Sequence, residues 1–186
     1  MAKSKTIHYF RIVAAVILLW LGLQYIGNVY FKYAFFALLL FVMEVDVVGE
    51  LGKKLSFKKG FVSVMLFVGL SILISRVFPV SGGFSLTLEG ILSAIVFAPI
   101  CEELFFRKAM NDRVPDIIGA LLSSAVFGIF HGVNAFLPTF IAGLGLFVIY
   151  RLTGSLKASI AAHMTNNALA VLTHPETVEF LRELIR

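Results

Sequence analysis

The sequence has few charged residues and a single cysteine. Charged side chains make up 15% of its 186 residues, whereas soluble domains carry about 25%. Cys101 has no second cysteine to pair with, which excludes a fold held together by internal disulfides. The chain also has no internal repeat and no low-complexity segment, so a repeat architecture and a disordered chain are excluded as well.

Apolar residues are correspondingly abundant, at 59% of the chain with 19 phenylalanines. A soluble domain of this length leaves too much surface facing water to bury so much apolar area. Because a membrane-spanning helix needs about 20 mostly apolar residues, we predict an all-α, polytopic membrane helical bundle that forms a single domain, residues 1–186. About seven transmembrane helices are expected, at 9–30, 33–51, 60–78, 86–110, 115–132, 136–152 and 156–172.

The net charge of +5 is interpreted as a topology signal. The chain has no motif that reads nucleic acid and no basic stripe with interleaved aromatics, so no nucleic-acid partner is expected. With the N-terminus inside, all of the 16 Lys and Arg residues lie on the inner side except Lys32, Arg76, Arg182 and Arg186, as the positive-inside rule requires. The C-terminus then lies outside, where the tail from Thr173 is expected to form a short amphipathic helix at the membrane interface.

Ionisable groups inside the predicted spans mark a candidate functional site. Each costs about 2.5–3.5 kcal/mol on membrane-insertion scales and is therefore a functional candidate by default. The fourth span carries Glu102, Glu103 and Arg107, the fifth ends at His131, and the seventh carries His163.

Helical spacing predicts which of these groups pair. Glu103 and Arg107 are four residues apart and face each other on a helix, whereas Glu102 is turned by about 100° and is left free to face a cavity. His163 and Asn167 have the same spacing of four and therefore share a face of the seventh span.

Other residues are expected to shape the helices around the site. Ser124, Gly128 and Gly132 form a stripe of small residues that permits close helix packing. Pro99 is expected to bend the fourth span and to free a backbone carbonyl beside the site. Glu102 lies about 16 Å along its helix from the loop at 111–115 and His131 about 24 Å, so tilt or bending must bring the two to the same depth.

A carboxylate, two histidines and an amide on three spans are the groups that water activation and oxyanion stabilisation need. The chain contains neither a serine nucleophile elbow nor a His-Glu-x-x-His motif, so hydrolases of those two kinds are excluded.

Three motifs follow one another in the order Glu102-Glu103-x-x-x-Arg107, Phe127-x-x-x-His131 and His163-x-x-x-Asn167. They resemble the motifs of the CPBP family, which comprises CAAX-processing type II endopeptidases and the bacteriocin-processing or immunity proteins also called Abi proteins. The resemblance implies a catalytic core at approximately 89–172, in an integral, multi-pass protein of a bacterial cell membrane. The chain departs from the family pattern at Lys108, where a glycine is usual.

The resemblance also implies roles for individual residues. Glu102 is expected to activate the attacking water with His131 beside it, while His163 and Asn167 stabilise the oxyanion. The supporting residues are Glu103, Arg107 and Phe127.

No cofactor is predicted. A divalent metal such as zinc stays open as an alternative, because Glu102, His131 and His163 together offer three N and O ligands and leave an open position. The expected partners are a membrane-associated peptide or protein substrate and membrane lipids.

The predicted function is therefore the hydrolysis of a peptide bond in a membrane-associated peptide or protein. Two alternatives remain open. An oxyanion site and a general base also serve acyl transfer to an amine on the same scaffold. In a non-enzymatic bacteriocin-immunity or peptide-binding membrane protein, the same polar cluster would hold a peptide.

Overall fold

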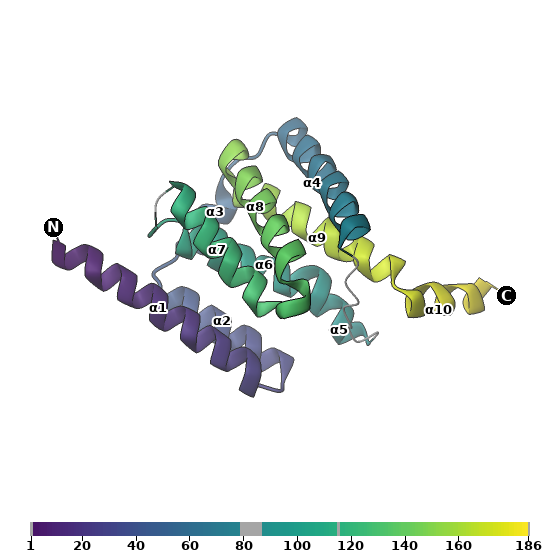
Figure 1. Cartoon of the computed structure of the whole chain (residues 1–186), viewed down its shortest axis with the longest axis horizontal. Coiled ribbons are helices and arrows are strands. Elements are labelled where there is room, and N and C mark those ends of the chain that lie inside the picture. The colour runs from purple at the N-terminus through teal and green to yellow at the C-terminus, as the bar shows by residue number, and fades with distance from the viewer. Residues whose placement is uncertain (1, 79–86, 115, 186) are drawn as a thin grey trace.

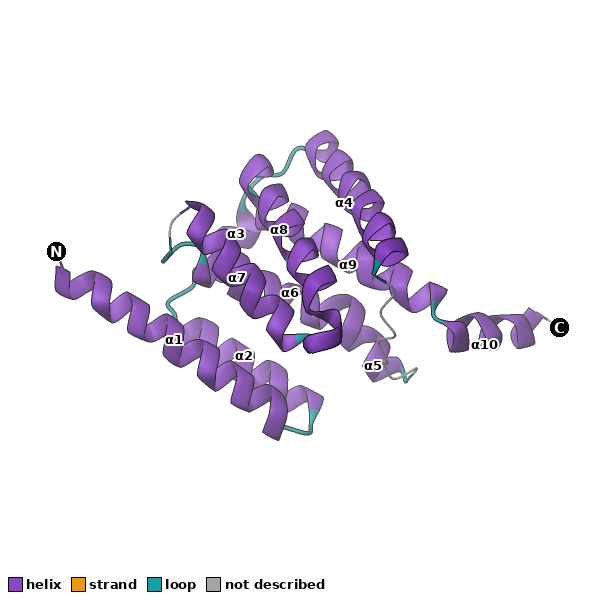
Figure 2. Cartoon of the chain, in the orientation of Figure 1, coloured by secondary structure: helices purple, strands orange, loops and turns teal. Residues whose placement is uncertain are grey.

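Helices make up all the regular structure in the part of the chain that the structure describes (Figure 2). The structure is a computed structural model, and it describes residues 2–78, 87–114 and 116–185. The predicted starts of the fourth and fifth spans, residues 86 and 115, lie outside the described residues. The all-α prediction is confirmed for the described residues.

The first two helices, α1 (Ala2–Tyr25) and α2 (Val29–Val42), form a hairpin along one side of the molecule (Figure 1). The segment 33–51 is not one continuous helix, because α2 ends at Val42 and a separate helix, α3 (Val47–Gly52), follows. Glu44 adopts a left-handed backbone conformation (φ 53°) that ends the helix. The Asp46 side chain then accepts a hydrogen bond from the backbone N–H of Gly49 and starts α3 as its N-cap.

The helices α4 (Phe57–Val77), α8 (Phe136–Thr153) and α9 (Leu156–Thr173) pack against one another on the opposite side (Figure 1). Their shared core contains Phe67 from α4, Leu146 from α8, and Ala158 and Ala162 from α9. α9 also contacts the helical segment that carries the two adjacent glutamates. α9 therefore joins this side of the molecule to the candidate site.

The predicted fourth span, 86–110, is not one regular α-helix. It alternates between α-helix and π-helix, as α5 (Leu88–Leu92), the π-helix η1 (Ser93–Phe97), α6 (Ala98–Glu102) and the π-helix η2 (Glu103–Met110). π-Helical turns are rare and occur frequently at functional sites. At Pro99, where a bend was predicted, the hydrogen bonding changes from π-helical to α-helical just before the proline.

The stripe of small residues lies where α7 (Asp116–Phe130) packs on α8. A Cβ on Gly128 would lie 2.9 Å from the backbone oxygen of Phe136, and a Cβ on Gly143 would lie 3.0 Å from the Ser124 side chain. The chain reverses between the two helices at Gly132 (φ 88°) and the short 3₁₀ helix η3 (Val133–Ala135). The close approach of α7 and α8 therefore depends on the absence of side chains at these glycines.

Gly128→Ala is expected to destabilise the protein by about 1–3 kcal/mol, the usual cost of overpacking, because the added methyl group meets a backbone carbonyl that has little room to move. Gly69→Ala is the matched control, since a Cβ there has nothing within 4 Å. It should be neutral or stabilising by up to about 1 kcal/mol, as is usual for glycine replaced by alanine in a helix. Thermal unfolding of the purified variants measures both. Equal effects of the two substitutions would contradict the close packing of α7 on α8.

A network of ion pairs ties α3 to the end of η2. Glu50 is 5% exposed and lies 2.6 Å from the Lys53 ammonium and 2.7 Å from that of Lys108, which also lies 2.6 Å from Asp112. Burial acts to raise the pKa of Glu50, but the hydrogen bonds from Lys108 and Lys53 lower it below its ordinary value. Lys108, the departure from the family pattern, therefore has a structural role in this chain.

Arg113 and Arg11 lie near the same end of the bundle as this network of ion pairs. The Arg113 guanidinium donates hydrogen bonds to the backbone carbonyls of Met43 and Ala109, and Arg11 lies 3.1 Å from Glu44. Lys53 and Lys108 make their contacts at this end as well. These basic residues, which the charge count assigns to the inner side of the membrane, therefore lie together at one end of the bundle.

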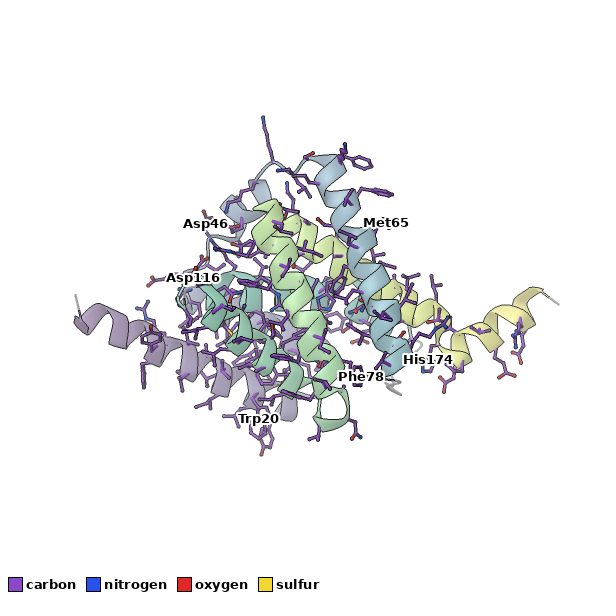
Figure 3. The ribbon with its side chains drawn as sticks, turned by 45° about the horizontal axis from the view of Figure 1, so that its top comes forward. Trp20, Asp46, Met65, Phe78, Asp116 and His174 are labelled. Carbon is purple, nitrogen blue, oxygen red and sulfur yellow. The ribbon has the colours of Figure 1, made fainter. Side chains whose placement is uncertain are left out.

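Large apolar side chains are exposed over much of the outer surface, as on α4, where Leu66 is 70% exposed, and on α1, where Trp20 points away from the bundle (Figure 3). Exposed apolar areas of this kind mark membrane or protein contacts. Among the described residues, two helices, Phe57–Val77 and Val133–Thr153, are long and apolar enough to cross a membrane. Shorter apolar helices are Tyr9–Leu23, Tyr30–Val42 and Asp116–Phe130. The count of seven spans remains a prediction.

The C-terminal segment forms a separate helix, α10 (Pro175–Ile185), which extends away from the bundle (Figure 1). It begins with proline, a residue that suits the first turn of a helix because its missing N–H would have no partner there. Its amphipathic character and its place at a membrane interface remain predictions.

Candidate active site

Glu103 and Arg107 form a fully buried ion pair. The Arg107 Nε atom lies 3.3 Å from Glu103 Oε2, and neither side chain has any exposed surface. The guanidinium also lies over the Phe127 ring, 5.4 Å from its centroid, at a distance typical of a cation–π contact. The i, i+4 spacing therefore brings the two charges together, as expected.

His163 lies between the two adjacent glutamates. Its Nδ1 atom is 3.1 Å from Glu103 Oε1, and its Nε2 atom is 3.7 Å from Glu102 Oε2. The imidazole is 6% exposed, whereas the Glu102 side chain is 20% exposed. The outward turn of Glu102 relative to Glu103 thus puts one carboxylate on each nitrogen of the same ring.

Ser159 is a member of the site that the sequence interpretation missed. It is fully buried, and its hydroxyl donates a hydrogen bond to Glu103 Oε2. Ser159, His163 and Asn167 follow one another at intervals of four along α9 and form one polar stripe. This spacing was readable in the sequence, because the His163–Asn167 pair extends backwards to Ser159 by one more turn.

Asn167 contacts the backbone of the glutamate-bearing segment. Its Nδ2 atom donates a hydrogen bond of 2.9 Å to the carbonyl of Ala94 in η1. The N–H of Ala98 bonds to the carbonyl of Ser93, five residues earlier, so the Ala94 carbonyl would pair in this register with residue 99. Since Pro99 has no N–H, Asn167 supplies the missing donor. The expected free carbonyl beside the site is thus that of Ala94.

Asn166 precedes Asn167 on α9 and lies about 100° from it around the helix. Its Nδ2 atom lies 3.4 Å from Asn167 Oδ1, so Asn166 contacts Asn167 at the limit of hydrogen-bond length. Both asparagines are partly buried.

His131 lies next to Phe127 at the end of α7. Its Nδ1 atom is 2.8 Å from the Phe127 carbonyl oxygen, and the two rings are 4.4 Å apart. The buried Phe127 ring also contacts the His163 ring edge-on, with centroids 5.8 Å apart. Phe127 therefore contacts both imidazoles, while the direct contacts of Glu102 are made with His163.

The alternative metal set is not assembled in the described part of the chain. There, no group of three or more His, Cys, Asp or Glu side chains is placed so that it could hold a metal ion. Glu102 and His163 are close, but His131 contacts Phe127 instead. The donor set present at the contact is thus one carboxylate and one imidazole, which is fewer than the three protein ligands of a catalytic zinc site.

Two hollows in the surface lie away from these residues. One is lined by the turn between α1 and α2 and by residues of α2, such as Ile26 and Phe35. The other lies between α1 and α7, lined by Tyr9 and Ile118 among others. Neither hollow is lined by Glu102, His131, His163 or Asn167.

Comparison with known protein families matches residues 83–169 to the family described as type II CAAX prenyl endopeptidase Rce1-like. Neither the curated proteins nor the solved structures contain a significant match. The matched range includes all three motifs, from Glu102 to Asn167. The match confirms the resemblance to the CAAX protease family over this part of the chain, and it supports a membrane-embedded protease as the general function.

Proposed function

We propose that this protein is an intramembrane peptidase that hydrolyses a peptide bond in a membrane-associated peptide or protein, with Glu102 as the general base. The observation that supports this proposal is the pair formed by Glu102 Oε2 and His163 Nε2, 3.7 Å apart. At that separation the two groups are too far apart for a direct hydrogen bond, and we place the attacking water beside the pair, where it can bond to both. Glu102 is the more exposed side chain of the pair, at 20% against 6% for His163, which leaves it accessible to water and substrate.

The reaction follows from these groups. Glu102 takes one proton from the water as the water oxygen bonds to the carbonyl carbon and the C=O electron pair moves onto the carbonyl oxygen. The tetrahedral intermediate collapses when that pair re-forms the C=O bond, the C–N bond breaks, and the proton held by Glu102 passes to the leaving nitrogen. The products are a free carboxyl group and an amine. Positioned general bases contribute about 10²–10⁴-fold to such rates.

His131 and Asn167 complete the proposed site. Asn167 has a second amide N–H besides the one that it donates to the Ala94 carbonyl, and we assign this N–H to the oxyanion. His131 is proposed to reach the site from α7 across the Phe127 ring, which contacts both imidazoles.

The function is tested by comparing membrane-associated peptides in cells with the protein, without it, and with Glu102→Gln in its place. We expect at least one peptide product that depends on both the protein and Glu102. Formation of this product in water enriched in oxygen-18 then separates hydrolysis from acyl transfer, because only hydrolysis puts the label into the new carboxyl group. A Glu102→Ala variant with full biological effect would instead favour an immunity or peptide-binding protein.

Asn167→Ala is expected to lower the rate by about 10²–10³, the usual effect of losing one oxyanion donor. It should also cost about 1–3 kcal/mol of stability, because the Ala94 carbonyl loses its partner. Asn166→Ala is the neighbouring control and should be mild, since its contact with Asn167 is long.

A Pro99→Ala background distinguishes the loss of rate in Asn167→Ala from its loss of stability. This substitution restores the backbone N–H at residue 99, which in the π-helical register is the partner of the Ala94 carbonyl. The stability cost of Asn167→Ala should then shrink while the loss of rate remains. If the rate recovers together with the stability, Asn167 acts only on the helix and not on the oxyanion.

The proposed topology has the N-terminus inside. In a Cys101→Ser background, single cysteines at Lys54 and Asp112 should react with a membrane-impermeant reagent only from the cytoplasmic side, and a cysteine at Arg76 only from the outside. This pattern follows from the excess of positive charge on the predicted inner loops. A reversed pattern would overturn the charge count and the cytoplasmic access of substrate that it implies.

A further inference from the structure

We infer that Glu103 is a positioning residue for His163: its carboxylate keeps the proton of the neutral imidazole on Nδ1, so that the Nε2 lone pair faces Glu102. His163 then accepts a hydrogen bond from the attacking water instead of donating one to the oxyanion. The inference deepens the proposed function and rests on it for its catalytic meaning, but the proton position itself is measurable without a substrate.

The surroundings of Glu103 fix it as a hydrogen-bond acceptor. Its carboxylate is fully buried and faces three groups, the Arg107 cation, the Ser159 hydroxyl and His163 Nδ1. Arg107 has only donors, and the Ser159 hydroxyl donates to Oε2. A carboxylate held in this way has only acceptor oxygens, so the 3.1 Å contact with His163 requires the proton to be on Nδ1.

A hydrogen bond at one imidazole nitrogen determines the state of the other. With the proton on Nδ1, the neutral His163 ring has only a lone pair at Nε2, where it faces Glu102 Oε2 at 3.7 Å. A water placed beside the pair can donate one O–H to each of these two acceptors. The lone pairs of the water oxygen then point away from both and are available for attack on a carbonyl carbon.

In catalysis, Glu102 and His163 then have different roles. Glu102 takes the proton of the O–H that it binds, and the second O–H stays on the oxygen that becomes part of the new carboxyl group, still donating to His163 Nε2. No further proton acceptor is needed. Stabilisation of the oxyanion then depends on Asn167 and not on His163.

Nitrogen-15 NMR of the histidine rings tests the inference, because ring nitrogen shifts and couplings distinguish the two neutral tautomers. The chain has four histidines, and the His163 signals are assigned by their loss in His163→Gln. In the wild-type protein, at a pH where the ring is neutral, we expect the proton of His163 on Nδ1. A wild-type ring with its proton on Nε2 overturns the inference, whatever the variants do.

Two double variants form a matched pair. Glu103→Gln with Arg107→Met keeps a side-chain carbonyl as acceptor for Nδ1, whereas Glu103→Leu with Arg107→Met removes it, and both leave no unpaired buried charge. We expect the proton to stay on Nδ1 with glutamine and to move to Nε2 with leucine, where it donates to Glu102. The same tautomer in both folded variants would show that Glu103 does not position the ring.

The outcomes for the inference and for the proposed function are distinguishable. If the proton lies on Nδ1 as expected but Glu102→Gln retains full peptide-processing activity, the positioning of His163 stands and the peptidase proposal fails. If Glu102→Gln is inactive and the wild-type proton lies on Nε2, the peptidase proposal stands and the positioning role of Glu103 fails.

Discussion

Glu102→Gln is expected to lower peptide hydrolysis by about 10²–10⁴-fold, the contribution of a positioned general base, while the protein accumulates and unfolds as the wild type does. Glutamine keeps the size and the hydrogen-bonding shape of the side chain but has no basic oxygen. The side chain is 20% exposed and has no part in the buried ion pair, so its charge is not needed for folding. The measurement is product formation per unit of folded protein in membranes or detergent.

Glu89→Gln is the matched control for this prediction. Glu89 lies in α5, on the same helical segment, but it is exposed and outside the three motifs. It should leave both activity and stability unchanged. Comparable losses in Glu102→Gln and Glu89→Gln would mean that the effect reflects charge on this segment and not a base at the site.

Glu103→Gln is expected to have the largest effect on stability. It leaves the guanidinium of Arg107 fully buried without its counter-charge, and breaking a buried pair in this way costs about 3–5 kcal/mol. The amount of folded protein should therefore fall together with activity. Thermal unfolding of purified protein and the yield of monodisperse material measure the first effect, and activity per folded molecule measures the second.

The contrast between the two glutamates is the test of their separate roles. Glu103→Gln combined with Arg107→Met should regain much of the lost stability, because the double substitution removes both buried charges. Glu102→Gln should need no such compensation. If both single variants lose stability equally, or if the double variant is no more stable than Glu103→Gln alone, the assignment of Arg107 to Glu103 is wrong.

Helix geometry made the local part of the site predictable. The i, i+4 spacing brings Arg107 to Glu103 and leaves Glu102 turned away, because neighbours on a helix surface are three and four residues apart whatever surrounds the helix. The effect of Pro99 was also predictable, since a residue without an N–H leaves one carbonyl unpaired. The small residues at Ser124 and Gly128 indicated close packing for the same local reason.

The sequence predicted continuous helices over 33–51 and 86–110. The structure has interrupted helices in both segments. Apolar composition predicts that a segment is buried in a membrane or a core. It does not predict the helix start that Asp46 stabilises by capping, nor the change from α-helical to π-helical hydrogen bonding. Such departures depend on single hydrogen bonds, and they are visible only when the partners of each backbone group are known.

The sequence by itself determined the all-helical class, the resemblance to the CAAX protease family and the pairing of residues within one helix, because composition, motifs and helical periodicity are properties of the chain alone. Only the tertiary structure decided that His163 meets both glutamates and that Asn167 reaches the Ala94 carbonyl. It also decided that His131 lies against Phe127. These contacts, except that of His131, join residues about 60 or more positions apart, and they depend on how α9 packs against the glutamate-bearing segment, which no local pattern specifies.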